Sequence, residues 1–489
     1  MQSHDGRIRT GVVIGAGPAG LTAAWELLRN GVRPIVLEQG DDVGGLARTA
    51  QYKGFHFDLG GHRFFTKVPE VQALWRELLG DDLLRRPRLS RIYYRGRFFR
   101  YPLRPLNALF GLGGWQSVRV GLSYLKWQVW PHDREETFEE WVTNRFGRRL
   151  FLHFFKTYTE KVWGVPCTEL RAEWAAQRIK DLSLRTALAS MFVRPRRTIT
   201  TLIEEFDYPR LGPGMMWRAL ADRIAAQGGE VRLGSRVVAV RRSGDTVTGV
   251  TVASNGAETT IAADVVVSTM PVTELVRRLD PPAADPVLAA ADQLRHRDFL
   301  TVCLIVRRAK VFPDNWIYVH DPDVQVGRIQ NFKNWSPDMV PDPSRTSLGL
   351  EYFCNEGDDL WTRSDDALVA LGARELAHIG LVHEDEVEDG CVARVRRAYP
   401  IYDTGYATHL DAIRRFVDGL GHLRTAGRNG LHRYNNQDHA MVTGTLAARS
   451  LVAGEQHDLW SVNTDPEYHE EVRAEAKTRL SPAVAGWMG

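Results

Sequence analysis

The residues that point most directly to chemistry are three glycines and a glutamate near the start of the chain. Gly15, Gly17 and Gly20 follow the apolar run Val12–Ile14 in the pattern G-x-G-x-x-G, and Glu38 ends the next apolar run. The first glycine permits a tight turn, the second lets a pyrophosphate approach the backbone, and the third lets a helix pack closely on a strand. The start of such a helix attracts phosphate, and a carboxylate placed like Glu38 accepts hydrogen bonds from ribose hydroxyls. The pattern therefore predicts a site for an adenine dinucleotide.

A strand, a helix and a second strand must follow one another to position these groups. The helical spacing of Leu21–Arg29, between two apolar runs, supplies that order. Similar patterning returns at 217–224, in a valine run at 265–268 and again at 422–429. Valines also alternate with polar residues on both sides of the turn at 243–245, which predicts a β-hairpin. We therefore expect a nucleotide-binding domain that is discontinuous in sequence.

Composition excludes several classes of protein. The 489 residues carry a formal net charge of only +3, which argues against a nucleic-acid partner. The four cysteines lie far apart without metal-ligand spacing, so we expect no metal site and a reducing, cytoplasmic location. No apolar run is long enough for a transmembrane segment, although the aromatic stretch 109–130 is expected to form amphipathic helices that could contact a membrane surface. A homodimer is compatible with the sequence.

The segment that follows Glu38 indicates which dinucleotide binds. Asp41–Thr49 resembles the extended fingerprint of FAD proteins in the amine oxidase, protoporphyrinogen oxidase and sugar mutase group. In that group the paired glycines let the chain run close to the flavin, and the arginine contacts the cofactor. The resemblance implies noncovalent FAD and adds Gly44, Gly45 and Arg48 to the cofactor site.

The predicted fold is α/β, with a Rossmann-type FAD-binding domain, a helical insertion and a mostly antiparallel β-sheet substrate domain. Apolar and charged residues recur at helical spacing from about 69 to 203, whereas strand patterns dominate from about 294 to 395. The predicted boundaries are 1–75, 213–275 and 396–455 for the FAD-binding domain, 76–212 for the helical insertion, 276–395 for the sheet domain and 456–489 for a C-terminal helix and tail.

A second resemblance concerns the reaction. Thr157–Gly164 reads TYTEKVWG and resembles the Y-T-E-K-x-W-G signature of UDP-galactopyranose mutases. Those enzymes interconvert the pyranose and furanose forms of a nucleotide-bound sugar by attack of reduced flavin N5 on the anomeric carbon. The resemblance implies a nucleotide-diphosphate sugar as substrate and a reductant that keeps the flavin reduced. Further segments follow in the family's order at 60–66, 98–103, 213–214, 399–401 and 427–434.

The mutase resemblance also implies roles for single residues. Arginine and tyrosine side chains suit a diphosphate, because they donate several hydrogen bonds to its oxygens. The implied catalytic residues are Arg328, His62, Tyr158 and Tyr434, and the implied substrate-binding residues are Trp163, Arg100 and Tyr399. The implied cofactor-binding set is Gly15, Gly17, Gly20, Glu38, Gly44, Gly45, Arg48, Gly61, Val237, Arg428 and Asn436.

The sequence departs from the mutase pattern at three positions and leaves alternatives open. Phe65 stands where the family has a second histidine, Asn436 where it has an aspartate, and Arg100 where it has a small amide. A different nucleotide sugar is therefore open. So is a FAD-dependent oxidoreductase of the amine oxidase, protoporphyrinogen oxidase or desaturase type, for which Lys333 could reach the flavin and the aromatic helices at 109–155 could form an apolar tunnel. Arg328 could equally be a surface arginine of a strand edge.

Overall fold

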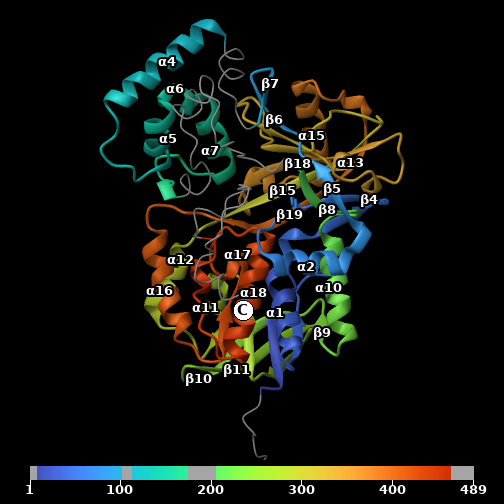
Figure 1. The fold of residues 1–489 in the computed structure, drawn as a ribbon, viewed down its shortest axis with the longest axis vertical. Coiled ribbons are helices and arrows are strands. Elements are labelled where there is room, and N and C mark those ends of the chain that lie inside the picture. Colours follow the sequence, from blue (N-terminus) through green and yellow to red (C-terminus); the bar gives the residue numbers. More distant parts are fainter. Residues whose placement is uncertain (1–7, 102–112, 174–204, 464–489) are drawn as a thin grey trace, which may run out of the picture.

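The computed structural model describes residues 8–101, 113–173 and 205–463, and Figure 1 shows two main parts, one above the other. The lower part is built on β1 (Thr10–Ile14), α1 (Pro18–Arg29) and β2 (Arg33–Leu37), which follow one another as the glycine pattern predicts. Their strands belong to a five-stranded sheet in the order β20-β13-β1-β2-β9, in which every neighbouring pair is parallel. The predicted Rossmann-type domain is confirmed.

The other strands of this sheet come from distant parts of the chain. They are β9 (Glu230–Arg232), β13 (Val265–Ser268) and β20 (Leu423–Thr425). The predicted returns of the chain at 265–268 and 422–429 are thus confirmed. The predicted hairpin at 243–245 joins β10 (Arg236–Ser243) to β11 (Thr246–Ser254), which continue into a second sheet with β12 (Ala257–Ala262) and β14 (Leu279–Asp280).

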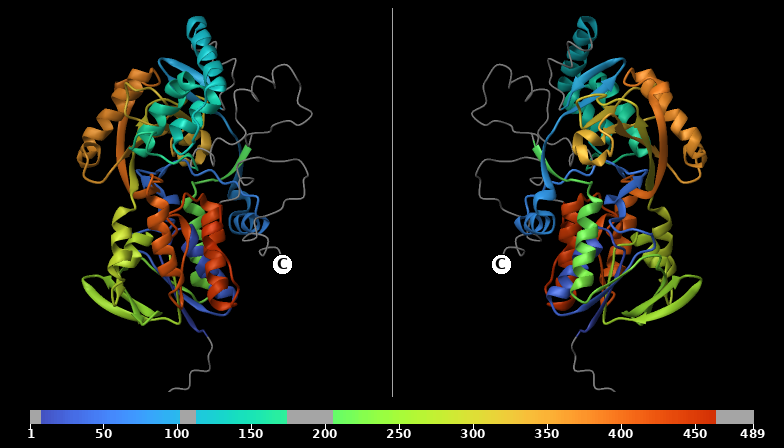
Figure 2. Two further views of the ribbon diagram at one scale, coloured as in Figure 1. Left: turned by 90° about the vertical axis from the view of Figure 1, so that its left-hand side faces the viewer. Right: turned by 90° about the vertical axis from the view of Figure 1, so that its right-hand side faces the viewer.

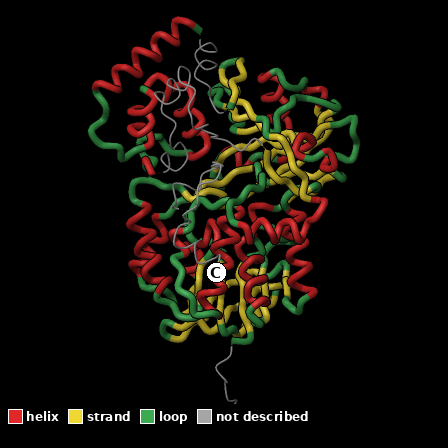
Figure 3. The backbone as a smooth tube through the Cα atoms, viewed as in Figure 1, coloured by secondary structure: helices red, strands yellow, loops and turns green. Residues whose placement is uncertain are grey.

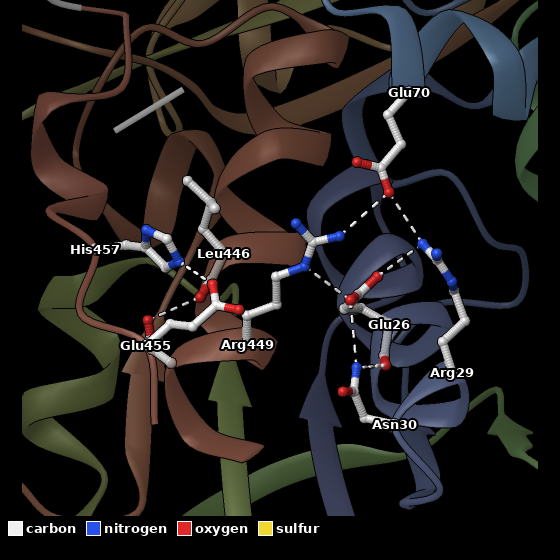
Figure 4. Close-up of polar contacts among 9 residues, drawn as sticks. Glu26, Arg29, Asn30, Glu70, Leu446, Arg449, Glu455 and His457 are labelled. Carbon is white, nitrogen blue, oxygen red and sulfur yellow. Dashed lines mark hydrogen bonds and ion pairs between the residues drawn. The ribbon is translucent and has the colours of Figure 1, made fainter. Parts of the chain in front are cut away.

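Helices cover the parallel sheet, and the two that matter most for the site are α1 and α18 (Gln437–Val452). They pack so closely that a Cβ atom on Gly444 would overlap the carbonyl oxygen of Ala19. Arg449 of α18 donates to Glu26 of α1 over 2.8 Å and to Glu70 of α2 (Pro69–Leu79) over 3.2 Å (Figure 4). Further helices of this part are α10 (Gly214–Ala226), α11 (Val272–Arg277), α12 (Asp285–Gln293), α16 (Tyr406–Asp418) and α17 (Gly427–Gly430).

A seven-stranded sheet crosses the upper part of the molecule (Figure 3). Its strand pairs are antiparallel except for the parallel pair β16–β6, which confirms the predicted, mostly antiparallel sheet. The helices α13 (Phe332–Trp335), α14 (Asp359–Thr362) and α15 (Asp365–Ile379) pack on it. The strands, in sheet order, are β19 (Val387–Pro400), β15 (His296–Val306), β18 (Thr346–Cys354), β17 (Arg328–Asn331), β16 (Trp316–Val319), β6 (Ser90–Tyr94) and β7 (Arg97–Arg100).

A helical unit forms the remaining part and reaches beyond the sheet (Figure 2). It contains α4 (Gly114–Val129), α5 (Phe138–Phe146), α6 (Arg148–Leu150), a π-helical turn η3 (Phe151–Lys156) and α7 (Thr157–Trp163). The sequence prediction of helix from 69 to 203 is wrong for 83–100, which forms β5 (Leu83–Pro87), β6 and β7. Arg95 and Gly96 both have positive φ and make a two-residue hairpin turn, a weaker sequence signal than Asn-Gly.

Two small sheets of two strands each connect the two parts of the molecule. β3 (Thr49–Tyr52) pairs with β4 (Phe55–Asp58) directly after the predicted flavin segment, and β5 pairs with β8 (Glu205–Pro209). Of the predicted C-terminal helix at 456–489, the structure describes only residues up to 463, which include a single 3-10 turn at Leu459–Ser461.

Candidate functional site

One large cavity, of about 920 Å³, extends from the glycine turn after β1 to the antiparallel sheet. It brings together residues that lie far apart in the sequence, from the β1–α1 turn to the start of α18. The sequence-predicted residues that line it are Gly15, Gly17, Glu38, Gly45, Arg48, Gly61, His62, Tyr158, Trp163, Val237, Arg328, Tyr399, Arg428, Tyr434 and Asn436.

The glycines at one end of the cavity are required by close backbone packing. A Cβ atom on Gly15, which has φ +97°, would overlap the hydroxyl of Thr269, and one on Gly45 would lie 3.2 Å from Cα of Gly17. Gly20 does not line the cavity. It is required for packing, since a Cβ there would overlap the carbonyl oxygen of Gly15. Gly44 lies behind the lining, where its N–H donates to the Ala16 carbonyl over 2.8 Å. Two glycine-rich loops thus leave open backbone where a pyrophosphate would lie.

Glu38 is fixed at the end of β2 by the backbone around it. Its Oε2 accepts from the Ala16 N–H over 2.9 Å, and its Oε1 accepts from the Gly40 N–H over 2.8 Å. The segment Ser235–Val237 lines the same end of the cavity. This arrangement places a carboxylate beside the glycine turn, as binding of a ribose requires.

Two helix N-termini and several buried polar groups also face the cavity. Within the described residues no side chain caps α1, whereas Asn436 caps α18 together with His439, as predicted for Asn436. The side chain of Asn435 and Oε1 of Gln437 are buried without a hydrogen-bond partner among the described residues, and both residues line the cavity. Buried polar groups normally have partners, so these fit a polar ligand such as FAD. Sequence reasoning missed both.

Arg328 marks the opposite end of the cavity, where the first residue of β17 meets β18. Its Nη1 lies 3.5 Å from Oε1 of Glu351, which is fully buried and also accepts from Gln330 Nε2 over 2.6 Å. Burial alone would lower the pKa of Arg328, but the Glu351 carboxylate holds that pKa well above its ordinary value. A Cβ atom on Gly61 would lie only 2.7 Å from Gln330 Nε2, so Gly61 allows the backbone to approach this group.

Phenol rings surround Arg328. Tyr399 and Tyr434 stack with ring centroids 5.8 Å apart, and Trp163 meets Tyr399 edge-on at 6.0 Å. Tyr158 stacks on His320 at 4.5 Å. Burial raises the pKa of Tyr158 above its ordinary value and that of Tyr399 to about 12, so both phenols stay protonated and can donate hydrogen bonds.

His62 lines the middle of the cavity and is neutral. Burial lowers its pKa to about 3, and the charges of Arg428 and Arg328 add to this effect. Its Nδ1 is buried and has no partner among the described residues, while its carbonyl accepts from Gln437 Nε2 over 3.3 Å. A neutral imidazole in this position suits hydrogen bonding to a ligand more than acid–base chemistry.

Arg428 is held mainly by the protein. It donates to the Asn435 carbonyl over 2.8 and 3.0 Å and to the Ala398 carbonyl over 3.0 Å, and its guanidinium lies 4.5 Å from the centre of the Tyr434 ring. These bonds fix the loop that leads into α18. The resemblance implies contact with the FAD pyrophosphate, and that role stays a prediction.

Besides Gly20 and Gly44, two more sequence-based candidates, Arg100 and Lys333, lie outside the cavity. Arg100 is exposed and does not line it, because strand alternation buries Phe99 instead; the neighbouring Tyr101 does line it. The assignment of Arg100 to substrate binding is therefore not supported by its position. Lys333 donates to the carbonyls of Ala309, Pro343 and Arg345, and no lysine is among the described residues that line the cavity.

The helical unit supplies an apolar wall. Phe138 at the start of α5 and Phe154 and Phe155 in η3 line the cavity beside Phe299 of β15. The cavity is therefore polar at its two ends and apolar on the side formed by the helical unit. In the described part of the chain no cluster of histidine, cysteine and acidic residues could hold a metal ion. None of the described helices is both long and apolar enough to cross a bilayer.

Comparisons with known proteins agree on a flavin-binding scaffold and differ in the reaction that they suggest. The family model for flavin containing amine oxidoreductases matches residues 18–452. Coproporphyrinogen III oxidase of Mycobacterium leprae is 26% identical over 421 residues, covering 83% of this chain and 91% of its own. A 15-cis-phytoene desaturase of Synechococcus elongatus is 24% identical, with coverage of 90% and 95%.

Solved structures show the same fold. Reduced UDP-galactopyranose mutase superposes with a TM-score of 0.80 at 21% identity, covering 95% of this chain and 99% of its own. Putrescine oxidase superposes with a TM-score of 0.58 at 18% identity, with coverage of 91% and 99%. The family model, together with the glycine turn and Glu38, identifies FAD as the cofactor for which the cavity is built.

Proposed function

The chain belongs to the flavin containing amine oxidoreductases, and from this premise we propose that it is a FAD-dependent mutase that interconverts the pyranose and furanose forms of a nucleotide-diphosphate sugar. The observation that carries this proposal is the Arg328 site. A guanidinium held by the buried Glu351 faces phenols that stay protonated, at the end of a cavity whose described lining contains no lysine.

The chain's own groups then have defined tasks. Arg328 and Tyr158 bind the diphosphate and keep it close after it leaves the sugar, because both donate hydrogen bonds to anionic oxygens. Trp163 and Tyr399 pack against the sugar or the base. FAD, when bound and reduced, supplies the nucleophile at the anomeric carbon. The phenylalanine wall excludes water, which would otherwise hydrolyse the activated sugar.

A FAD-dependent oxidoreductase is the second candidate. The sequence relatives are oxidases and desaturases, and the apolar side formed by Phe138, Phe154 and Phe155 would suit a polycyclic or polyene substrate. In that case Arg328 would bind a carboxylate or would serve only to close the cavity.

The experiment that separates the candidates uses the purified yellow protein, with the sugar incubations under anaerobic conditions and the oxygen-uptake assays in air-saturated buffer. Nucleotide sugars, including UDP-galactose, are incubated with the oxidised protein and with the dithionite-reduced protein, and the products are separated by chromatography. A furanose product formed only by the reduced protein supports the mutase. Absence of sugar conversion in both states, with oxygen uptake on porphyrinogens, amines or polyenes, supports the oxidoreductase.

A further inference from the structure

The outer face of α4 carries a row of apolar side chains that the described chain leaves open. Trp115 is 73% exposed and Leu122 is 63% exposed, values that are unusual for large apolar residues. The row repeats at intervals of three and four residues, so it occupies one side of the helix along its whole length. Its members, here called the α4 stripe, are Trp115, Val118, Leu122, Leu125 and Val129.

The opposite face fastens α4 to the helical unit. Val120 is buried in the core, and Gln128 Nε2 donates to the Asn144 carbonyl over 3.0 Å. The backbone of Tyr124 lies so close to Gly147 that a Cβ there would be 2.9 Å away. The stripe therefore faces outward because the other side of the helix is already used for packing. In both views of Figure 2, α4 stands at the far end of the molecule.

The positions of charged residues and tryptophans on α4 indicate which kind of surface the stripe would contact. Arg119 and Lys126 are the charged residues of α4, the helix contains no aspartate or glutamate, and helical spacing puts both beside the stripe. Trp115 begins the stripe, Trp130 directly follows the last residue of α4, and both are exposed. Apolar side chains, flanking cations and terminal tryptophans on one helix are the features of a helix that lies in a membrane interface.

We propose that α4 docks the protein on the surface of a bilayer rich in anionic phospholipid, with the α4 stripe inserted among the acyl chains. A helix of this length spans about 24 Å and presents its apolar side chains along one straight, outward line, which a flat surface can contact all at once. Arg119 and Lys126 then lie at the level of the phosphate groups. The same unit supplies Phe138 and Phe154 to the cavity, so docking brings one wall of the cavity close to the membrane.

Vesicle co-sedimentation of the holoprotein tests the proposal. Binding to mixed phosphatidylcholine and phosphatidylglycerol vesicles is expected to be about 10-fold tighter than to pure phosphatidylcholine vesicles, and to weaken with salt. Leu122→Glu is expected to reduce binding about 10-fold or more, because a charge replaces an inserted side chain. Leu233→Glu makes the same change at a residue that is 43% exposed in the loop between β9 and β10, and it should bind as the wild type does.

Two further measurements separate the role of the stripe from misfolding and from self-association. The double variant Arg119→Gln/Lys126→Gln keeps the stripe and should lose only the preference for anionic vesicles. Flavin content and the oligomeric state by light scattering are measured on every variant. Equal sedimentation of Leu122→Glu and wild type overturns the proposal, as does absence of vesicle binding. A dimer that depends on Leu122 and does not bind vesicles also overturns it, because the stripe would then contact a second copy.

Discussion

The two ends of the cavity are built in different ways. At the cofactor end the decisive atoms belong to the backbone, since a side chain on Gly15, Gly20 or Gly45 would press against neighbouring atoms. At the Arg328 end, the proposed substrate end, they belong to side chains, because Arg328 is paired with Glu351 and phenols line the same part of the cavity. The first arrangement tolerates almost no added atom, whereas the second can change its ligand when one side chain changes. This difference explains how one scaffold serves oxidases, desaturases and mutases.

The largest effect is expected from crowding the cofactor end. Gly20→Ala places a methyl group against the Gly15 carbonyl, and we expect a loss of about 3 kcal/mol or more in unfolding free energy together with loss of bound FAD. Flavin absorbance and thermal unfolding measure both quantities. Gly121→Ala is the control, because an added Cβ there meets no atom of the described residues within 4 Å. A yellow, stable Gly20→Ala protein would contradict the view that backbone packing defines this end.

Removing the Arg328 guanidinium should show that the two ends of the cavity act independently. Arg328→Ala is expected to lower turnover about 10²- to 10³-fold, as loss of a hydrogen bond to a developing anion does, while FAD remains bound. Turnover of whichever reaction is found and the flavin-to-protein ratio are the readouts. Arg85→Ala, at an arginine whose side chain is 69% exposed, is the matched control. Unchanged turnover would remove Arg328 from the site.

A buried carboxyl at the end of β4, behind the cavity lining, should make stability depend on pH. Asp58 accepts hydrogen bonds from Thr49 and Tyr208, yet burial raises its pKa to about 7. Between about pH 4 and pH 7 the unfolded chain loses a proton that the folded protein retains, so stability falls as pH rises, by up to about 4 kcal/mol. Chemical unfolding across this range should show the fall in wild type and a flatter curve in Asp58→Asn. Parallel curves would show that Asp58 titrates normally.

The smallest effect is expected on the pH dependence of turnover when His62 is replaced. Because burial and the nearby arginines hold its pKa near 3, its imidazole is neutral throughout the range from about pH 5 to pH 8. The pH profiles of turnover for wild type and His62→Asn should therefore have the same shape in this range, whatever their heights. A step near pH 6.5 that disappears in the variant would show that His62 takes up a proton during the reaction.

The same contrast explains what could be predicted from the sequence. A backbone turn leaves a strict pattern, so the glycines, the βαβ unit and the discontinuous sheet were all predictable. Side-chain clusters leave no such pattern in the sequence, because their members come from separate strands. Tyr158 and Trp163 were found only through a resemblance, and Glu351 resembles any single acid in an apolar strand.

Two errors have local causes. Arg100 was assigned to the substrate site from its motif, but strand alternation turns it outward and brings Tyr101 to the cavity. The sequence pattern predicts helix where β6 and β7 form a hairpin, because Arg95-Gly96 is an uncommon turn pair. Gln437 and Asn435 were missed, since amides near a helix start are common and only their burial beside a cavity shows a use.

The packing of α1 against α18 has a consequence for how the protein is made. The helix that follows the first glycine turn is complete at Arg29, but its partner begins only at Gln437. A ribosome adding roughly 5–20 residues each second needs on the order of 20–80 s to cover that distance. Throughout this time the face of α1 that packs on Gly444 of α18 lacks its partner. The nascent chain must therefore remain soluble with an unfinished cofactor domain, and the flavin site is complete only after α18 has been synthesised.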